Sequence, residues 1–154
     1  KFADRMGLKQ QKERISADGL GKLVNASWKN NPGMTKERKD AIFESEIKRI
    51  LHKPNSVVHL QKTPIDCYEL SIDIIHINKE RNHNVTESEA KSFIDNAYFS
   101  VSVWDGRFER YYSKLGATYV DMEGKEIRTA FKAKEFDDIT KSLIKEYEQY
   151  DKSK

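Results

Sequence analysis

The first third of the chain has apolar residues at helical spacing. Across residues 15–28 they recur close to helical spacing, which predicts an amphipathic helix. The sequence Asn-Asn-Pro-Gly at residues 30–33 then breaks the chain. We expect Thr35 to cap a second helix, which runs to Lys53 along an apolar stripe and stops at Pro54 because proline cannot continue a helix.

In the middle third the spacing changes from helical to alternating. Residues 56–60 form a short β-type run, and residues 68–77 alternate apolar and polar positions before becoming apolar throughout. We expect a strand in each of these segments. Thr86 is followed three residues later by Glu89, which is the pattern of a capping box. This pattern predicts a helix that begins after Thr86 and runs through Ala97.

The last third combines two hairpin patterns with a final helix. The predicted elements are strands at residues 99–104, 108–113, 118–122 and 126–131 and a helix at residues 137–150. Asp-Gly and Glu-Gly pairs mark the turns within the two hairpins. The sequence therefore predicts an α+β fold, in which N-terminal helices precede an antiparallel sheet with an inserted helix and a C-terminal helix.

Length and charge suggest a division of the chain. We expect an N-terminal helical segment at residues 1–55 and an α+β core at residues 56–154, or a single domain made of both. Residues 1–62 hold 14 Lys and Arg against 7 Asp and Glu, whereas residues 63–154 hold 14 against 18. A basic front half attracts phosphate backbones at long range, although a solvated helical surface has the same composition.

The composition also excludes several classes of protein and site. No run approaches the ~20 apolar residues of a membrane helix, so we expect no membrane partner. Lys1 begins a charged stretch without an initiator Met, so we expect no signal peptide and a piece cut from a longer protein. The single cysteine, Cys67, excludes an internal disulfide and a multi-cysteine zinc site. It suits a small buried apolar position better than a catalytic thiol.

Two histidines are the first candidates for proton transfer. We expect His76 at the end of a strand and His83 in the polar loop that follows it. Imidazole titrates near neutral pH, so the two are suited to be the base and the acid of a phosphodiester transesterification. A purely structural role is the alternative for each. A second alternative is that the two histidines bind a metal together with Asp73 or Glu80. Their spacing fits no standard zinc pattern, so we expect neither a metal nor a cofactor.

The predicted sheet supplies arginines beside hydroxyl groups. Arg107 follows the turn of the first hairpin. On the next strand, Arg110 and Tyr112 share one face and Tyr111 takes the other, because side chains alternate along a strand. An arginine in such a position is suited to hold a phosphate with two hydrogen bonds and to stabilise its added charge.

The last predicted strand carries Arg128 and Thr129 on opposite faces. The hydroxyls of Tyr112 and Thr129 are suited to hydrogen-bond a phosphate, and a tyrosine ring is suited to stack on a base. The alternative is structural. Aromatic residues on strands usually belong to the core, and an exposed arginine on a strand is usually a surface charge.

The order of these features is similar to that of a known group of nucleases. The segments that carry the similarity are IDIIHINKERNH, TESEAKSFIDNA and WDGRFERYYSKLGATYVDMEGKEIRTAFKAKEFD. Their layout resembles the phage and polymorphic-toxin nucleases of the barnase–EndoU–colicin–RelE group. In that group a histidine-bearing loop follows a strand, and a helix and a sheet with Arg, Tyr and Ser or Thr come next. The resemblance covers roughly residues 56–138.

The resemblance implies a toxin-type ribonuclease that cleaves RNA, often tRNA, by metal-independent transesterification at the ribose 2′-OH. Such modules act in the bacterial cytoplasm, form the C-terminal part of larger secreted or phage proteins, and are held inactive by an immunity protein. The implied site has a histidine as base or acid, an arginine on the phosphate, and two hydroxyls that orient it. The residues implied for these roles are His76, His83, Arg107, Arg128, Tyr112 and Thr129.

Three other functions fit the same sequence. The first is an ADP-ribosyltransferase toxin, which would hold NAD with residues 110–113 and use Glu126 as its catalytic carboxylate. The second is a binding module without turnover, which would attach to nucleic acid or protein through the basic front half. The third is a structural phage or adaptor domain.

Overall fold

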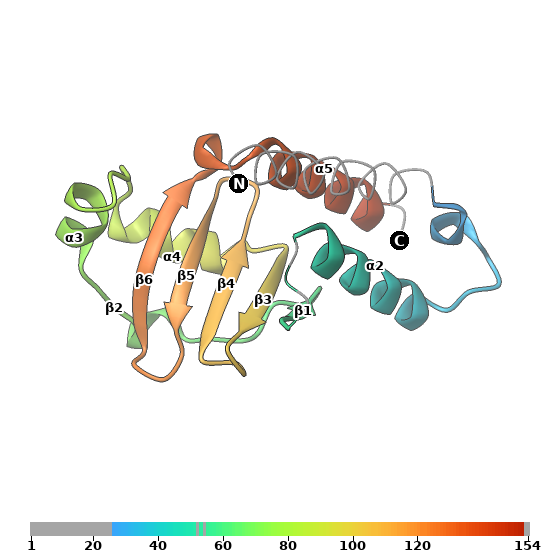
Figure 1. Cartoon of the computed structure of the whole chain (residues 1–154), viewed down its shortest axis with the longest axis horizontal. Coiled ribbons are helices and arrows are strands. Elements are labelled where there is room, and N and C mark those ends of the chain that lie inside the picture. The colour runs from blue at the N-terminus through green and yellow to red at the C-terminus, as the bar shows by residue number, and fades with distance from the viewer. Residues whose placement is uncertain (1–25, 52, 54, 153–154) are drawn as a thin grey trace, which may run out of the picture. The chain divides into compact units, whose positions relative to one another are not determined.

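The computed structural model describes residues 26–51, 53 and 55–152 (Figure 1). In sequence order, helices precede and follow a mainly antiparallel sheet, with a further helix inserted before its central strands. The α+β class predicted from the sequence is therefore confirmed. The helix predicted at residues 15–28 lies outside the described residues except for its last three, and Ser27–Asn30 forms a short 3-10 helix, η1.

Two compact units make up the chain. One contains residues 1–54 and 138–154, and the other contains residues 55–137. The predicted division into residues 1–55 and 56–154 stays a prediction. The second unit holds the whole sheet.

The first unit contains two long helices. These are α2, Lys36–Ile50, and α5, Asp138–Lys152. Thr35 caps α2 as predicted, because its hydroxyl accepts a hydrogen bond from the Arg38 backbone N–H at 3.2 Å. The helix ends before the predicted Lys53. Aromatic rings from η1, α2 and α5 form a cluster made of Trp28, Phe43, Tyr147 and Tyr150.

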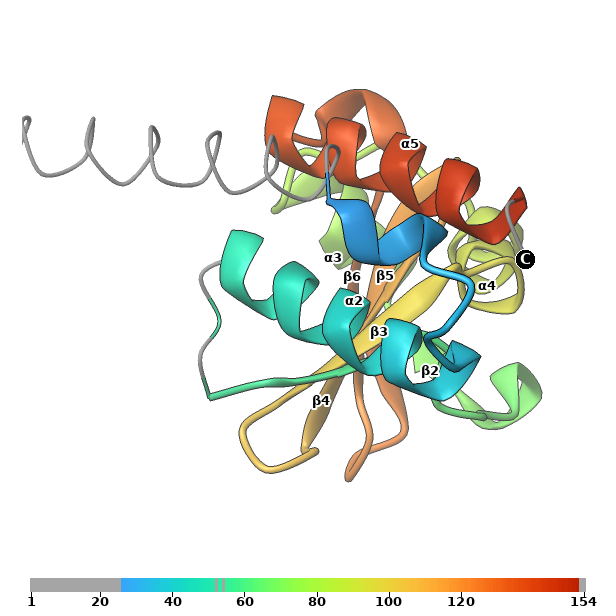
Figure 2. The same ribbon diagram turned by 90° about the vertical axis from the view of Figure 1, so that its right-hand side faces the viewer.

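A six-stranded sheet organises the second unit (Figures 1 and 2). Its strands are β1 Val57–His59, β2 Ser71–Ile72, β3 Phe99–Val103, β4 Phe108–Tyr112, β5 Gly116–Asp121 and β6 Glu126–Lys132. They lie in the order β1-β3-β4-β5-β6-β2, and every neighbouring pair is antiparallel except β2 with β6. Both predicted hairpins are thus present as β3–β4 and β5–β6.

The strand predicted at residues 68–77 is wrong for most of its length. The segment forms a 3-10 helix, η2 Cys67–Glu69, then the short β2, and then helix α3, Ile74–Lys79. Asp73 starts α3 because its side chain accepts the His76 backbone N–H at 3.1 Å. His76 therefore lies on a helix and not at the end of a strand.

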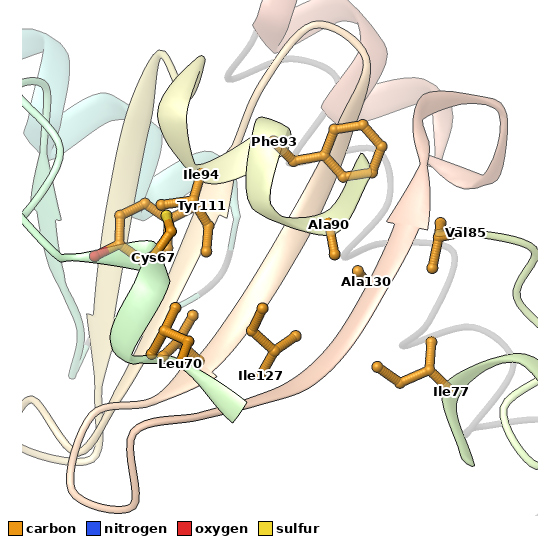
Figure 3. Packing of buried hydrophobic residues seen from close by; sticks show 11 residues of the cluster. Cys67, Leu70, Ile77, Val85, Ala90, Phe93, Ile94, Tyr111, Ile127 and Ala130 are labelled. Carbon is orange, nitrogen blue, oxygen red and sulfur yellow. The ribbon is translucent and has the colours of Figure 1, made fainter. Parts of the chain in front are cut away.

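Helix α4, Glu87–Asp95, packs against one face of the sheet (Figure 3). The capping box predicted from Thr86 and Glu89 is present, with both of its hydrogen bonds. The helix ends at Asp95 and not at the predicted Ala97. Its buried residues meet a cluster from the strands that includes Tyr111, Val120, Ile127 and Ala130. We call this side of the sheet the helix-covered face and the other side the opposite face.

The capping box gives a direct test of how α4 is held. We expect Thr86→Ala to lower the free energy of unfolding by about 1 kcal/mol, because the Glu89 backbone N–H loses its partner. Ser88→Ala on the same helix is the matched control, since Ser88 is exposed and alanine is a good helix former. Urea denaturation measures both. Equal stability of the two variants would contradict the structural role of the cap.

Candidate functional site

Three residues lie side by side across the centre of the opposite face. In the strand register, Arg110 on β4 is the direct neighbour of Tyr119 on β5, and Tyr119 is the direct neighbour of Thr129 on β6. The Arg110 Cζ lies 4.6 Å from the centroid of the Tyr119 ring, which places the guanidinium over the ring. We call Arg110, Tyr119 and Thr129 the cross-strand row.

Tyr112 lies on the same face as the row. Its hydroxyl is 3.4 Å from the Tyr119 hydroxyl, and its ring stacks on Phe99 with centroids 5.2 Å apart. Burial, and then the neighbouring Tyr119, raises the pKa of Tyr112 well above its ordinary value, and the charge and hydrogen bond of Arg110 oppose this shift in part. The Tyr112 hydroxyl therefore stays protonated at neutral pH and cannot act as a base. The prediction that Arg110 and Tyr112 share a face is confirmed, and Tyr111 belongs to the helix-covered core.

Thr129 ends the row with a buried hydroxyl. The residue is 7% exposed, and its Oγ1 is the buried side-chain polar atom for which the described part of the chain offers no hydrogen-bond partner. A buried hydroxyl without a partner costs about 1–3 kcal/mol, so proteins seldom keep one without reason. This hydroxyl belongs to a side chain on the opposite face, and its donor is unused among the described residues.

His83 adjoins the row through two aromatic contacts. Its ring lies 5.4 Å from the ring of Phe131, which in turn lies 5.5 Å from that of Tyr119. The His83 Nδ1 is 2.9 Å from Glu135 Oε1, and the histidine side chain is 18% exposed. A carboxylate at Nδ1 selects the tautomer that carries its proton there, which leaves the lone pair on Nε2.

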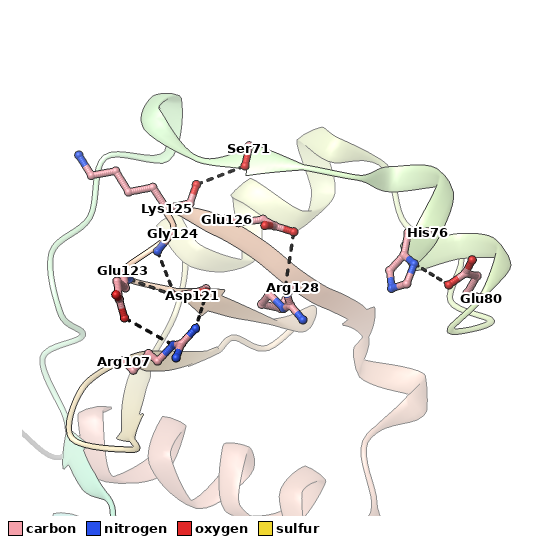
Figure 4. A network of polar contacts seen from close by, with 10 residues as sticks. All are labelled: Ser71, His76, Glu80, Arg107, Asp121, Glu123, Gly124, Lys125, Glu126 and Arg128. Atoms are coloured by element: carbon pink, nitrogen blue, oxygen red, sulfur yellow. Dashed lines mark hydrogen bonds and ion pairs between the residues drawn. The ribbon is translucent and has the colours of Figure 1, made fainter.

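His76 is apart from this group. It lies on α3, where its Nδ1 is 2.7 Å from Glu80 one turn later (Figure 4). Among the described residues, no hydrogen bond, ion pair or ring contact joins the His76 side chain to His83 or to the row. The two histidines are therefore not brought together as a pair, because the segment between them forms a helix and a turn in place of the expected strand end.

Arg107 lies in the β3–β4 turn and contacts two carboxylates (Figure 4). Its guanidinium is 3.8 Å from Asp121 Oδ2 and 3.7 Å from Glu123 Oε2, and its Cζ is 5.2 Å from the Phe108 ring centroid. Hydrogen bonds from the backbone N–H of Gly124, and then the Arg107 charge, lower the pKa of Asp121. Arg107 is thus engaged by anionic side chains that compete with a phosphate.

Arg128 belongs to the same charged region at the end of the sheet. The register of β5 and β6 shifts after Tyr119, so Arg128 is an extra residue in a β-bulge and is not held to the strand alternation. Its guanidinium is 3.9 Å from Glu126 Oε1, and its charge also lowers the pKa of Asp121. Of the six residues predicted for the site, Tyr112, Thr129 and His83 thus gather around the row.

Three residues of this arrangement are not among the six predicted for the site. The sequence indicates Arg110 as a strand arginine on the face of Tyr112, but it does not indicate Tyr119 or Glu135. Counting back from the turn of the second hairpin pairs Val120 with Ile127 and would place Tyr119 beside Arg128. The β-bulge makes Thr129 its neighbour instead, and no sequence signal marks this bulge. No sequence signal pointed to Glu135, which comes from the 3-10 helix η3, Ala133–Glu135, after the sheet.

The residues expected for ADP-ribosyl transfer are not gathered on one side. The Tyr111 hydroxyl donates to the Thr63 carbonyl at 2.9 Å on the helix-covered side. The buried Ser113 hydroxyl donates to the Gly116 carbonyl at 2.7 Å and accepts from the Gly116 N–H at 3.1 Å. Both hydroxyls therefore make hydrogen bonds within the fold.

A cluster of metal-binding side chains and a membrane-spanning helix are both missing from the described part of the chain. Its His, Cys, Asp and Glu side chains form no group of three or more suited to hold a metal ion. None of its helices is long and apolar enough to cross a bilayer.

Cys67 lies in the core and lines a cavity of about 370 Å³ between η2 and α4. Its Sγ is 3.4 Å from Asp95 Oδ1. Burial, and then the hydrogen bond to the Asp95 carboxylate, raises the pKa of the thiol to about 11.

This raised pKa predicts an unreactive thiol. At pH 8 about 0.1% of Cys67 is thiolate, against roughly a quarter of a free cysteine. The higher intrinsic nucleophilicity of a basic thiolate recovers only part of this difference. We expect iodoacetamide to alkylate Cys67 at least about tenfold more slowly than free cysteine at pH 8, and the difference to disappear in urea. Alkylation at the rate of free cysteine in the folded protein would contradict this.

Comparisons of the chain with protein-family models, with curated proteins and with solved structures found no match.

Proposed function

We propose that this chain is a toxin-type ribonuclease domain that cleaves RNA by metal-independent transesterification at the ribose 2′-OH. The observation that carries the proposal is the cross-strand row, in which a guanidinium, a tyrosine ring and an unpartnered hydroxyl lie side by side on one sheet face. A planar cation beside a neutral donor is suited to bind a phosphate group. His83 adds an imidazole oriented by a carboxylate.

Arg110 is the proposed phosphate ligand. Its guanidinium donates parallel hydrogen bonds to two phosphate oxygens, and its permanent charge stabilises the additional negative charge of the pentavalent phosphorane. Neighbouring strands are about 4.8 Å apart, so the Cα atoms of Arg110 and Thr129 are roughly 10 Å apart across β5. The long arginine side chain spans part of this distance over Tyr119. Thr129 donates to the same phosphate once the side chains that cover its buried hydroxyl move aside.

His83 is the proposed proton acceptor. Its Nε2 takes the proton of the 2′-OH while that oxygen attacks the adjacent phosphorus, and the bond from phosphorus to the 5′-oxygen breaks. The leaving 5′-oxygen gains a proton from water. The products are a 2′,3′-cyclic phosphate and a 5′-hydroxyl. Glu135 stabilises the imidazolium that forms, because its carboxylate already holds the Nδ1 proton.

The biological setting of the proposal comes from the resemblance to the toxin nucleases. It comprises an RNA substrate, tRNA included, an immunity protein that neutralises the domain, and action in the bacterial cytoplasm after delivery as the C-terminal part of a larger secreted or phage protein. A protein that blocks the opposite face would block the row directly.

The reaction is tested by incubating structured RNA with the protein in EDTA. We expect RNA to be cleaved as fast with EDTA as without it, because the proposed phosphate ligand and base are side chains and no metal takes part. Mass spectrometry should identify 2′,3′-cyclic phosphate ends. An RNA methylated at every 2′-oxygen is the control and should stay intact. Uncut RNA, cleavage only with added Mg²⁺, or 3′-hydroxyl ends would contradict the proposal.

Single substitutions test the assignment of roles. We expect Arg110→Ala to lower kcat about 10²–10³-fold and His83→Gln to lower it about 10²–10⁴-fold, because one removes the phosphate ligand and the other the base. Arg38→Ala on α2 and His76→Gln on α3 are the matched controls, and both should keep at least about half of the activity. A loss with His76→Gln as large as with His83→Gln would overturn the choice of base.

A further inference from the structure

Trp104 is the most exposed tryptophan or phenylalanine among the described residues. It lies in the turn between β3 and β4, and 76% of its surface is exposed. An indole buries more apolar area than almost any other side chain, and an isolated turn has no structural need for one. With Tyr68, it is one of the two large aromatic side chains that the described residues leave exposed.

The backbone at Trp104 is as unusual as the exposure. Trp104 has φ of +54°, Asp105 of +56° and Gly106 of +87°, so three successive residues adopt left-handed conformations. Glycine and aspartate are common in such turns, but a bulky tryptophan is not. Backbone strain of this kind concentrates at ligand-binding positions, where the surrounding structure maintains it.

The neighbours of Trp104 hold the indole in place. Its ring meets the Phe108 ring edge to face, with centroids 5.9 Å apart and planes at 82°. Phe108 is in turn covered by the Arg107 guanidinium, which Asp121 and Glu123 hold. The contact with Phe108 supports the indole, which we call the platform, and leaves most of its surface open to a stacking ligand.

The charges around this platform favour a neutral planar ligand over a phosphate. The carboxylates of Asp121 and Glu123 lie beside Arg107 and repel an anion. A nucleobase has no charge and stacks on an aromatic face. Its ring N–H and amino groups can also donate hydrogen bonds to the nearby carboxylates.

The platform also lies close to the cross-strand row. Phe108 precedes Arg110 by two residues on β4, so the two share the opposite face about 7 Å apart along the strand. A short stretch of extended RNA can therefore place a base at Trp104 while one of its phosphates meets Arg110.

We propose that Trp104 is the stacking site for an unpaired nucleobase next to the scissile phosphate, so that the protein selects single-stranded RNA. This inference rests on the proposed ribonuclease function. A base in a duplex is already stacked on its neighbours, and only loops, bulges and ends offer a free base. By binding an unpaired base, Trp104 directs the cross-strand row to the phosphates next to unpaired bases in a folded RNA.

The test measures binding separately from cleavage. The probe is a fluorescently labelled single-stranded DNA oligonucleotide of six nucleotides, which lacks the 2′-OH and stays intact. We expect Trp104→Ala to raise the Kd about 5- to 100-fold, by the usual contribution of one base–aromatic stack, and Trp104→Phe to raise it much less. Tyr68→Ala, which removes another highly exposed aromatic residue, is the matched control and should leave Kd unchanged.

A second probe of the same length with abasic sites should bind wild type and Trp104→Ala equally. An unchanged Kd for Trp104→Ala on the first probe, or no binding of that probe to wild type, would overturn the stacking site. These results are independent of the cleavage assay. If wild type and Trp104→Ala cleave RNA with equal kcat/KM, the stacking site is overturned and the ribonuclease proposal stands. If the oligonucleotide binds through its bases but RNA is not cleaved, the ribonuclease proposal is overturned and the stacking site stands.

Discussion

The packing of α4 against the sheet determines the arrangement of the whole second unit. Side chains alternate along a strand, so the residues that face α4 decide which residues lie on the other side. Tyr111 belongs to the core under the helix, and the Thr118 hydroxyl donates to the Ala90 carbonyl of α4 at 2.7 Å. Arg110 and Tyr119, each one residue away along the chain, are therefore on the opposite face. A slip of one residue in β4 would place the Arg110 guanidinium under the helix, and a slip in β5 would place the Tyr119 ring there.

Close contact at one end of β5 strengthens this constraint. Gly116 begins the strand, and a Cβ at this position would lie 2.4 Å from Phe93 of α4 and 2.6 Å from the Phe131 carbonyl oxygen. Only glycine fits between the helix and β6 at this approach. Phe93 is itself buried in the core, so the close contact at Gly116 fixes the position of α4 relative to β5 and β6. The row is thus built on paired strands, which position side chains more precisely than loops do.

The hairpins could be predicted from the sequence, whereas the segment around His76 could not. Alternation and Gly-containing turns are local signals, and they located β3 to β6 and the cap at Thr86. The run of isoleucines before His76 fits a strand and a short helix equally well, and an Asp73 side chain that caps the helix decided between them. For the site, alternation correctly grouped Arg110 with Tyr112. Register between strands and the Glu135 contact of His83 depend on tertiary structure, which a single sequence does not encode locally.

The central claim is that the opposite face of the sheet, at the cross-strand row, binds the phosphate of an RNA substrate. A titration followed by NMR tests it most directly, with the protein labelled with ¹⁵N and a dinucleotide whose 2′-OH is replaced by hydrogen. We predict that chemical-shift changes saturate together at the Arg110 side-chain Nε–H and at the backbone amides of Tyr119 and Thr129, while the amides of α4 stay unchanged. Shifts confined to α4 and the cavity beside Cys67, or no shifts at the row, would contradict the account.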